Sequence, residues 1–206
     1  MNVAAMVDAS QSKFLIVDAH ALIYRAYYAF PNLTDPTGRL VNAVYGFTRI
    51  LLTAIRQLGP KYMAIAFDHP KPTKRHQAFA DYKAHRVEMP DDLKPQIEII
   101  KEVVKALNIP QFEMAGYEAD DLIGAVNFQM EKLGQKFLTV VVTGDQDIFQ
   151  LVDHNTRVWL PARGKNQPSA LYDEQKVKEK IGVRPDQVVD LKALMGDASD
   201  NIPGIK

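Results

Sequence analysis

Cysteine is absent from this 206-residue sequence. The absence excludes disulfide bonds, thiolate catalysis and cysteine-ligated zinc. No apolar run reaches the ~18 residues that a transmembrane helix needs. The first twelve residues, "MNVAAMVDASQS", contain neither a basic cluster nor a continuous apolar segment, so they do not resemble a secretory signal. We therefore expect a cytoplasmic protein that makes no contact with membranes, with a disordered lead-in at residues 1–12.

Nucleotide-binding loops are also missing, because neither a Walker A loop nor a GxGxxG pattern follows any expected strand. Net charge is zero, since 25 basic residues balance 25 acidic ones. The charges are nevertheless separated along the chain. Residues 71–86, "KPTKRHQAFADYKAHR", contain five Lys or Arg, two His and a single acidic residue. This local basic segment is a better indication of a binding partner than the net charge of zero.

Four apolar runs have the length of strands: residues 14–19, 62–68, 137–145 and 156–162. Segments with helical periodicity accompany them: residues 41–59, 91–108, 118–134, 173–182 and 185–195. The runs do not alternate apolar and polar residues, which is typical of parallel strands buried on both faces. Strands separated by helices favour the same arrangement. We predict one α/β domain with a mostly parallel central sheet flanked by helices.

Acidic residues recur where these strands end. Asp18, Asp68 and Asp145 each close a strand, and the carboxyl ends of parallel strands share the edge where ligands bind. The segment "GYEADDLIGAV" adds three carboxylates at the start of a helix that should face the same edge. Others follow in "GDQD" and, at the helical spacing i, i+3, in "GDASD". The nine candidates are Asp18, Asp68, Glu118, Asp120, Asp121, Asp145, Asp147, Asp197 and Asp200.

Each of these acidic residues alone is more often a helix cap or a turn former. Together they are costly, because each pair of like charges at ~4 Å repels by about 4 kcal/mol at an effective dielectric near 20. Hard divalent cations prefer oxygen ligands of this kind and would relieve the repulsion. Without Cys or clustered His, magnesium or manganese is favoured over zinc. Two such ions are a recurring solution for phosphodiester hydrolysis.

If the basic segment forms a helix over residues 73–87, Arg75, Phe79, Tyr82 and Arg86 share one face, with Lys83 beside them. Basic side chains of this kind contact phosphates, and an aromatic ring can stack on an exposed base. The alternative is a solvated charged helix without a ligand.

Five segments together resemble the 5′ nuclease, or flap endonuclease, family, which includes the 5′→3′ exonuclease domain of bacterial DNA polymerase I. The likeness runs from about Phe14 to the last residue. The segments, in the order of the family, are "FLIVDAHALIYRAYYAFP", "YMAIAFDHPKPTKRHQAFADYKAHR", "GYEADDLIGAV", "VVTGDQDIFQLV" and "LMGDASDNIPGIK".

The resemblance implies a PIN-like domain over residues 13–182, with a helical arch at about 70–91. It also implies two Mg²⁺ or Mn²⁺ ions. The first would be held by Asp18, Asp68, Glu118 and Asp120. The second would be held by Asp145, Asp147 and Asp197, with Asp121 and Asp200 acting directly or through water. Catalysis would depend on Asp145, Asp147, Lys83 and Arg86, the last two on the scissile phosphate. Tyr82 would stack on the terminal nucleotide, and Arg25 and Arg75 would make further DNA contacts.

Residues 183–206 match the start of a helix–hairpin–helix element, which in the family grips duplex DNA with a bound monovalent ion such as K⁺. The chain stops at Lys206, inside that element, so we expect a truncated element. The implied protein is a monomeric, divalent-metal-dependent 5′→3′ exonuclease and 5′ flap endonuclease. It would act on DNA with a 5′ flap or 5′ end in primer removal and repair at the bacterial nucleoid, with a polymerase domain in a longer chain. Alternatives are a catalytically silent DNA-binding module and a PIN-type ribonuclease.

Overall fold

The structure is a computed structural model that describes residues 12–133, 137–164 and 166–205. Most of the expected lead-in, residues 1–11, lies outside the described residues, and Ser12 already belongs to the first strand. The elements of the first half are β1 (Ser12–Asp18), α1 (Ala19–Ala29), α2 (Asn42–Leu58), β2 (Tyr62–Ala66), α3 (Lys74–Ala78), α4 (Lys94–Ala106) and β3 (Gln111–Phe112). Those of the second half are α5 (Ala119–Lys132), β4 (Phe137–Val142), η2 (Asp147–Leu151), β5 (Thr156–Leu160), β6 (Ala170–Tyr172), α6 (Glu174–Ile181), η3 (Pro185–Gln187), α7 (Val188–Met195), β7 (Gly196–Asp197) and β8 (Ile202–Pro203).

The main sheet has six strands in the order β3-β2-β1-β4-β5-β6. The first five pair in parallel, and β6 joins the edge antiparallel to β5. A separate antiparallel pair, β7 and β8, follows α7. The prediction of a mostly parallel sheet is therefore confirmed.

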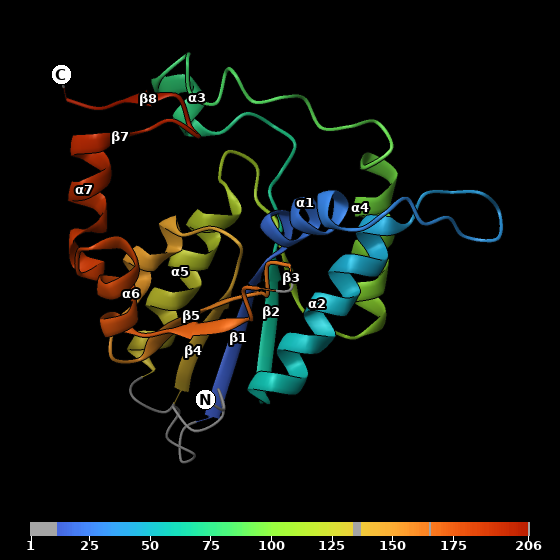
Figure 1. The fold of residues 1–206 in the computed structure, drawn as a ribbon, viewed down its shortest axis with the longest axis horizontal. Helices are drawn as coiled ribbons and strands as arrows, with labels where there is room; N and C mark the ends of the chain where they lie inside the picture. Colours follow the sequence, from blue (N-terminus) through green and yellow to red (C-terminus); the bar gives the residue numbers. More distant parts are fainter. Residues whose placement is uncertain (1–11, 134–136, 165, 206) are drawn as a thin grey trace.

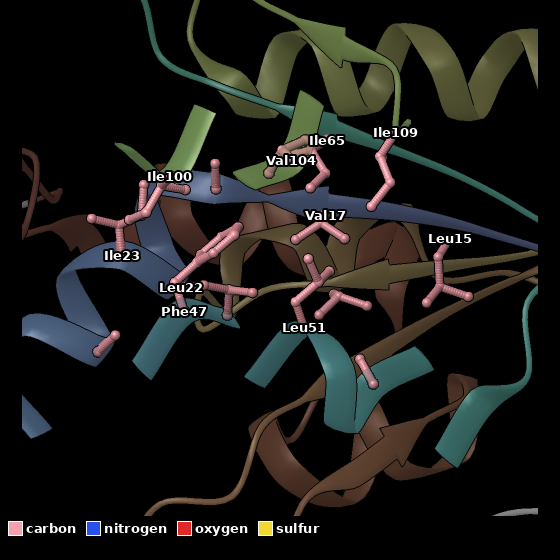
Figure 2. Close-up of a cluster of buried hydrophobic side chains, with 14 of the residues drawn as sticks. Leu15, Val17, Leu22, Ile23, Phe47, Leu51, Ile65, Ile100, Val104 and Ile109 are labelled. Carbon is pink, nitrogen blue, oxygen red and sulfur yellow. The ribbon is translucent and has the colours of Figure 1, made fainter. Parts of the chain in front are cut away.

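Both faces of the sheet are buried. Leu15 and Val17 of β1 pack into a core with α1, α2 and α4 (Figure 2), whereas Phe14 and Ile16 pack into a second core with α5. Figure 1 shows the corresponding layers, with α1, α2 and α4 on one side of the sheet and α5, α6 and α7 on the other. Burying one such side chain stabilises the fold by roughly 1.5–3 kcal/mol. Burial on both faces explains why the strands show no alternation.

Helix α2 forms as its periodicity predicts. Phe47, Leu51 and Leu58 are buried, and Gly59 ends the helix in the left-handed conformation, with φ of 58°. Within the part of the chain that the structure describes, no helix is long and apolar enough to cross a bilayer.

The basic segment does not form the continuous helix considered for residues 73–87. Helix α3 ends at Ala78, and turns follow through residue 85. Lys83 has a left-handed backbone, with φ of 56°, which a helix does not accommodate. Its N–H instead bonds the carbonyl of Asp200, at 3.0 Å. Figure 1 shows this stretch running past the β7–β8 pair and on across the molecule to α4, so an arch exists although little of it is helical.

Asp197 and Asp200 do not lie on a helix either. Asp197 ends β7, and Asp200 lies in the turn that connects β7 to β8. The spacing of three residues is therefore that of a tight turn, in which the N–H of Asp200 bonds the carbonyl of Asp197 at 3.2 Å.

Candidate metal centre and nucleic-acid cleft

Asp18 lies at the end of the central strand and also caps α1. Its Oδ1 accepts a hydrogen bond from the N–H of Ala21 at 3.1 Å, and its Oδ2 accepts one from the hydroxyl of Thr143 at 2.7 Å. Burial raises the pKa of Asp18 to about 6, against the effect of these two hydrogen bonds, and the charges of Asp68 and Asp145 add to the increase. The strand-end carboxylates are thus close enough to repel one another.

Asp68 follows β2 and connects that strand to α5. Its Oδ1 accepts a hydrogen bond from the N–H of Ala119 at 2.6 Å. The N–H of Asp68 donates to Nδ1 of His20 at 3.0 Å. Burial lowers the pKa of His20, so its ring is neutral and its proton lies on Nε2. His20 was not singled out in the sequence, where a histidine two residues after a strand-end aspartate gives no distinctive signal.

The three carboxylates of "EADD" point to different partners. Asp121 forms a two-pronged ion pair with Arg75, with N–O distances of 2.8 and 2.7 Å, and Arg75 lowers its pKa. Glu118, the N-cap of α5, accepts from the ammonium group of Lys83 at 2.8 Å. Two of the three charges are therefore neutralised by the arch.

Asp120 is the third carboxylate, and nothing neutralises it. Among the described residues, no hydrogen bond or ion pair of its side chain is found. Burial raises its pKa to about 8, and the charges of Asp18, Asp145, Asp68 and Glu118 contribute in that order. An acidic group in this setting lacks a positive counter-charge.

A second acidic group lies around Lys192 of α7. Its Nζ is 2.8 Å from Oδ1 of Asp147 and 2.9 Å from Oδ2 of Asp197. Asp145 is adjacent, because its Oδ1 accepts from the N–H of Asp147 at 2.9 Å. Lys192 was not predicted as a site residue from the sequence. Its position five residues before Asp197 in "LKALMGD" is the one signal that could have placed it near that carboxylate.

The arch closes over Asp200. The guanidinium of Arg86 lies 2.6 Å from Oδ1 of Asp200. Tyr82 is buried, and its hydroxyl lies 3.0 Å from Oδ2 of Asp200 and 3.1 Å from Oε2 of Glu118. The expected common face of Arg75, Phe79, Tyr82 and Arg86 is therefore absent, since Arg75 and Arg86 reach different carboxylates and Tyr82 points inward.

Beside the acidic groups opens a cleft of about 880 Å³. Asp145 and Asp147 line one part of it, and Arg25, Arg86 and Lys192 line others, with Tyr28 and Arg163. Arg25 of α1 does not point freely into solvent, because its Nη2 donates to the carbonyl of Pro161 at 3.1 Å and to that of Ala162. The cleft thus combines carboxylates with guanidinium and ammonium groups.

Of the described residues, no three acidic or histidine side chains stand in an arrangement ready to coordinate one ion. The chemistry of the donors nevertheless fits hard divalent cations, which take carboxylate oxygens. Burial and neighbouring carboxylates raise the pKa values of Asp18 and Asp120, and a cation bound between them would favour their charged forms. The carboxylates of Glu118, Asp121, Asp147, Asp197 and Asp200 are instead occupied by basic side chains.

The sequence was compared with protein families and with individual known proteins, and both comparisons point to the same family. The family model described as "5'-3' exonuclease, N-terminal resolvase-like domain" matches residues 13–182. The chain is 43% identical over 195 residues to DNA polymerase I of Caldicellulosiruptor bescii, which covers 94% of this chain and 23% of that protein. It is 40% identical over 192 residues to the 5′-3′ exonuclease of Aquifex aeolicus, covering 93% of this chain and 64% of that protein.

Among solved structures, the T5 D15 protein co-crystallised with metal ions superposes with a TM-score of 0.74 at 19% identity, covering 94% of this chain and 70% of that one. The catalytic core of Rad2 in complex with DNA substrate gives a TM-score of 0.58 at 20% identity, covering 95% and 58%. At these identities the superpositions show a shared fold.

Proposed function

Because the chain belongs to the 5′-3′ exonuclease N-terminal resolvase-like domain family, we propose that it hydrolyses phosphodiester bonds of DNA at 5′ flaps and 5′ ends. The chain spans about a quarter of its DNA polymerase I relative from C. bescii and about two thirds of the A. aeolicus exonuclease. Those names support a role in bacterial DNA replication and repair, and hence in the cytoplasm at the nucleoid. A polymerase domain in the same protein, and a K⁺-binding helix–hairpin–helix element begun by residues 183–206, stay predictions.

One observation carries the proposal. Burial, and after it the charges of carboxylates from the ends of β1, β2 and β4 and from the start of α5, raise the pKa of Asp120 to about 8. These carboxylates adjoin a cleft with basic walls. Binding a polyanion beside a group of carboxylates needs this arrangement, because the basic side chains attract the phosphates that the carboxylates alone would repel.

Divalent cations, Mg²⁺ or Mn²⁺, complete the site in this proposal. Asp18, Asp68, Glu118 and Asp120 would hold one ion, and Asp145, Asp147 and Asp197 another, with Asp121 and Asp200 acting directly or through water. When bound, such ions supply positive charge and activate water. The metal ions co-crystallised with the T5 D15 protein, which shares this fold, support metal binding but do not test which residues hold each ion.

The basic side chains of the arch would act on the phosphate. Lys83 and Arg86 are now paired with Glu118 and Asp200. Both cations therefore lie beside carboxylates that would hold the metal ions. They would contact a scissile phosphate in the cleft and neutralise charge that develops on its oxygens. Arg75 and Tyr82 stay predicted DNA contacts, although each has a protein partner in this structure. Arg25, which the sequence also suggested as a DNA contact, instead donates to the carbonyl of Pro161.

The test is cleavage of a labelled 5′-flap DNA, with a blunt duplex and single-stranded RNA alongside, in magnesium and then in EDTA. We expect cutting near the flap junction that needs magnesium and disappears when Asp145→Ala and Asp147→Ala are combined. Glu102→Gln, on the exposed side of α4, is a matched control that should cut normally. Cleavage that survives EDTA or the double substitution would contradict the metal site. Preferential cutting of RNA would favour a PIN-type ribonuclease, and metal-independent binding without cutting would favour a silent DNA-binding module.

A further inference from the structure

The loop after β5 brings an arginine to the wall of the cleft. Arg163 and Gly164 both line it. The loop is turned back at this point, because the N–H of Arg163 bonds the carbonyl of Gln167 at 2.7 Å and Gly164 takes a φ of 65°. Arg163 itself is exposed, so its guanidinium is available to a ligand in the cleft.

Arg25 holds this loop in place from α1. Its guanidinium donates to the carbonyls of Pro161 and Ala162, the two residues before Arg163. The two arginines are near enough that the charge of Arg163, after burial, contributes to lowering the pKa of Arg25. The guanidinium of Arg25 thus fixes the backbone of the loop that carries Arg163.

Neither arginine is neutralised by a carboxylate among the residues that the structure describes. The other cations of the site have acidic partners: Arg75 pairs with Asp121, Arg86 with Asp200, and Lys192 with Asp147 and Asp197. Two adjacent positive charges without a counter-ion repel each other, and a bound anion would relieve that repulsion. Arg25 and Arg163 line the same cleft as Asp145 and Asp147.

We infer that Arg163 binds a backbone phosphate of the nucleic-acid strand, next to the scissile phosphate, and that Arg25 is the positioning residue that fixes the Arg163 loop. This inference rests on the proposed function and deepens it by naming a substrate contact. The cleft of about 880 Å³ is far larger than one phosphate needs, and it continues to the carboxylates. A continuous strand in this cleft can therefore contact both Arg163 and the acidic groups.

The first test is DNA binding in EDTA, so that nothing is cut. Affinity for the 5′-flap DNA is measured over a range of salt concentrations for the wild type, Arg163→Gln and Arg56→Gln. Arg56 is a matched control, because it is exposed near the end of α2 and does not line the cleft. Loss of Arg163 should weaken binding about tenfold, as for one charge-assisted hydrogen bond. It should also reduce the slope of log K against log salt by about 0.7–0.9, the value for one phosphate contact.

The second test locates the phosphate. Single methylphosphonate linkages, which carry no charge, are placed at successive positions around the cleavage site. At one position the neutral linkage should weaken binding by the wild type and by Arg56→Gln, but cost Arg163→Gln nothing further. A merely structural role for Arg163 would give the same loss in all three proteins at every position, and that result would overturn the inference.

Arg25 is distinguished by a double substitution. If Arg25 only positions the loop, Arg25→Gln should weaken binding when Arg163 is present and have little further effect in Arg163→Gln. Full additivity would assign Arg25 a phosphate of its own and overturn the positioning role. If the wild type neither binds nor cuts flap DNA, the proposed function fails and the inference with it. If the wild type binds and cuts while Arg163→Gln is unchanged, only the inference fails.

Discussion

The ammonium nitrogen of Lys83 lies 2.8 Å from Oε2 of Glu118, 35 residues away in the sequence. Lys83 belongs to the arch and Glu118 to the start of α5, so the pair ties the arch to the acidic groups. The side chains of both are mostly buried, at 17% and 13% exposure, which makes the attraction stronger than that of a surface pair. A candidate metal ligand, Glu118, is therefore paired with a candidate catalytic cation, Lys83.

Replacing Lys83 with methionine should lower the rate of cleavage by about 10²–10³-fold, the usual cost of removing one group that stabilises transition-state charge. Methionine keeps most of the length of the side chain but not its charge. Single-turnover cleavage of flap DNA at saturating magnesium measures the effect. A rate within twofold of the wild type would show that Lys83 serves only to pair with Glu118.

Replacing Tyr82 with phenylalanine separates two roles of this residue. The hydroxyl contacts Glu118 and Asp200, whereas stacking on a nucleotide would need only the ring. We expect Tyr82→Phe to raise the magnesium concentration for half-maximal rate by about tenfold or more, as for the loss of a group that orients a metal ligand. Tyr82→Leu, which also removes the ring, is the comparison. If phenylalanine behaves as the wild type and leucine does not, stacking is the role.

The strand-end carboxylates could be predicted because their positions follow from local sequence. An apolar run that ends in Asp18, or shortly before Asp145, can be recognised as a strand without knowing its sheet partners, and its carboxylate then lies at the edge of the sheet. The same holds for α2, where the apolar period and Gly59 define both the buried face and the end.

The arch could not be predicted in this way, because its conformation is set by residues far along the chain. Tyr82 and Arg86 have the spacing of a helix face, but they are drawn toward Glu118 and Asp200 instead. The N–H of Lys83 likewise donates to the carbonyl of Asp200, 117 residues further along the chain. Lys192 and Arg163 were missed for the same reason: a lone basic residue gives no signal until the fold places it beside carboxylates or in a cleft.

Two glycines in helices, one packed against α1 and one not, allow a test of how closely α1 packs on α2. A Cβ on Gly46 of α2 would lie 2.7 Å from Cβ of Ala26 and 2.7 Å from Cδ2 of Phe30, so α1 packs directly on this residue. Gly46→Ala should destabilise the protein by about 1–3 kcal/mol, since overpacking shifts the backbone. Gly124 of α5 has nothing within 4 Å of the same position. Gly124→Ala should therefore stabilise by about 0.5–1 kcal/mol through helix propensity. Equal effects in urea unfolding would contradict the close approach.

The stability of the metal-free protein should fall as the pH rises from about 6.5 to 8. The pKa of Asp120 is about 8 in the folded protein and 3.8 in the reference state, so over this window the folded chain holds a proton that the unfolded chain has lost. Free energy of unfolding decreases with pH wherever the folded state binds more protons. His20, whose pKa is lowered by burial, acts oppositely, but its effect is confined to pH values near and below the ordinary histidine pKa of 6.5.

Urea unfolding in EDTA at several pH values measures this slope, and Asp120→Asn should abolish it, because the amide stays neutral throughout. Magnesium should reverse the trend in the wild type, since ionised carboxylates bind the cation and binding to the folded state alone stabilises it. A stability that stays flat or increases between pH 6.5 and 8 in EDTA would mean that Asp120 is already ionised in the folded protein. The carboxylates would then not be short of positive charge, and the principal physical reason for placing a metal ion at Asp120 would be lost.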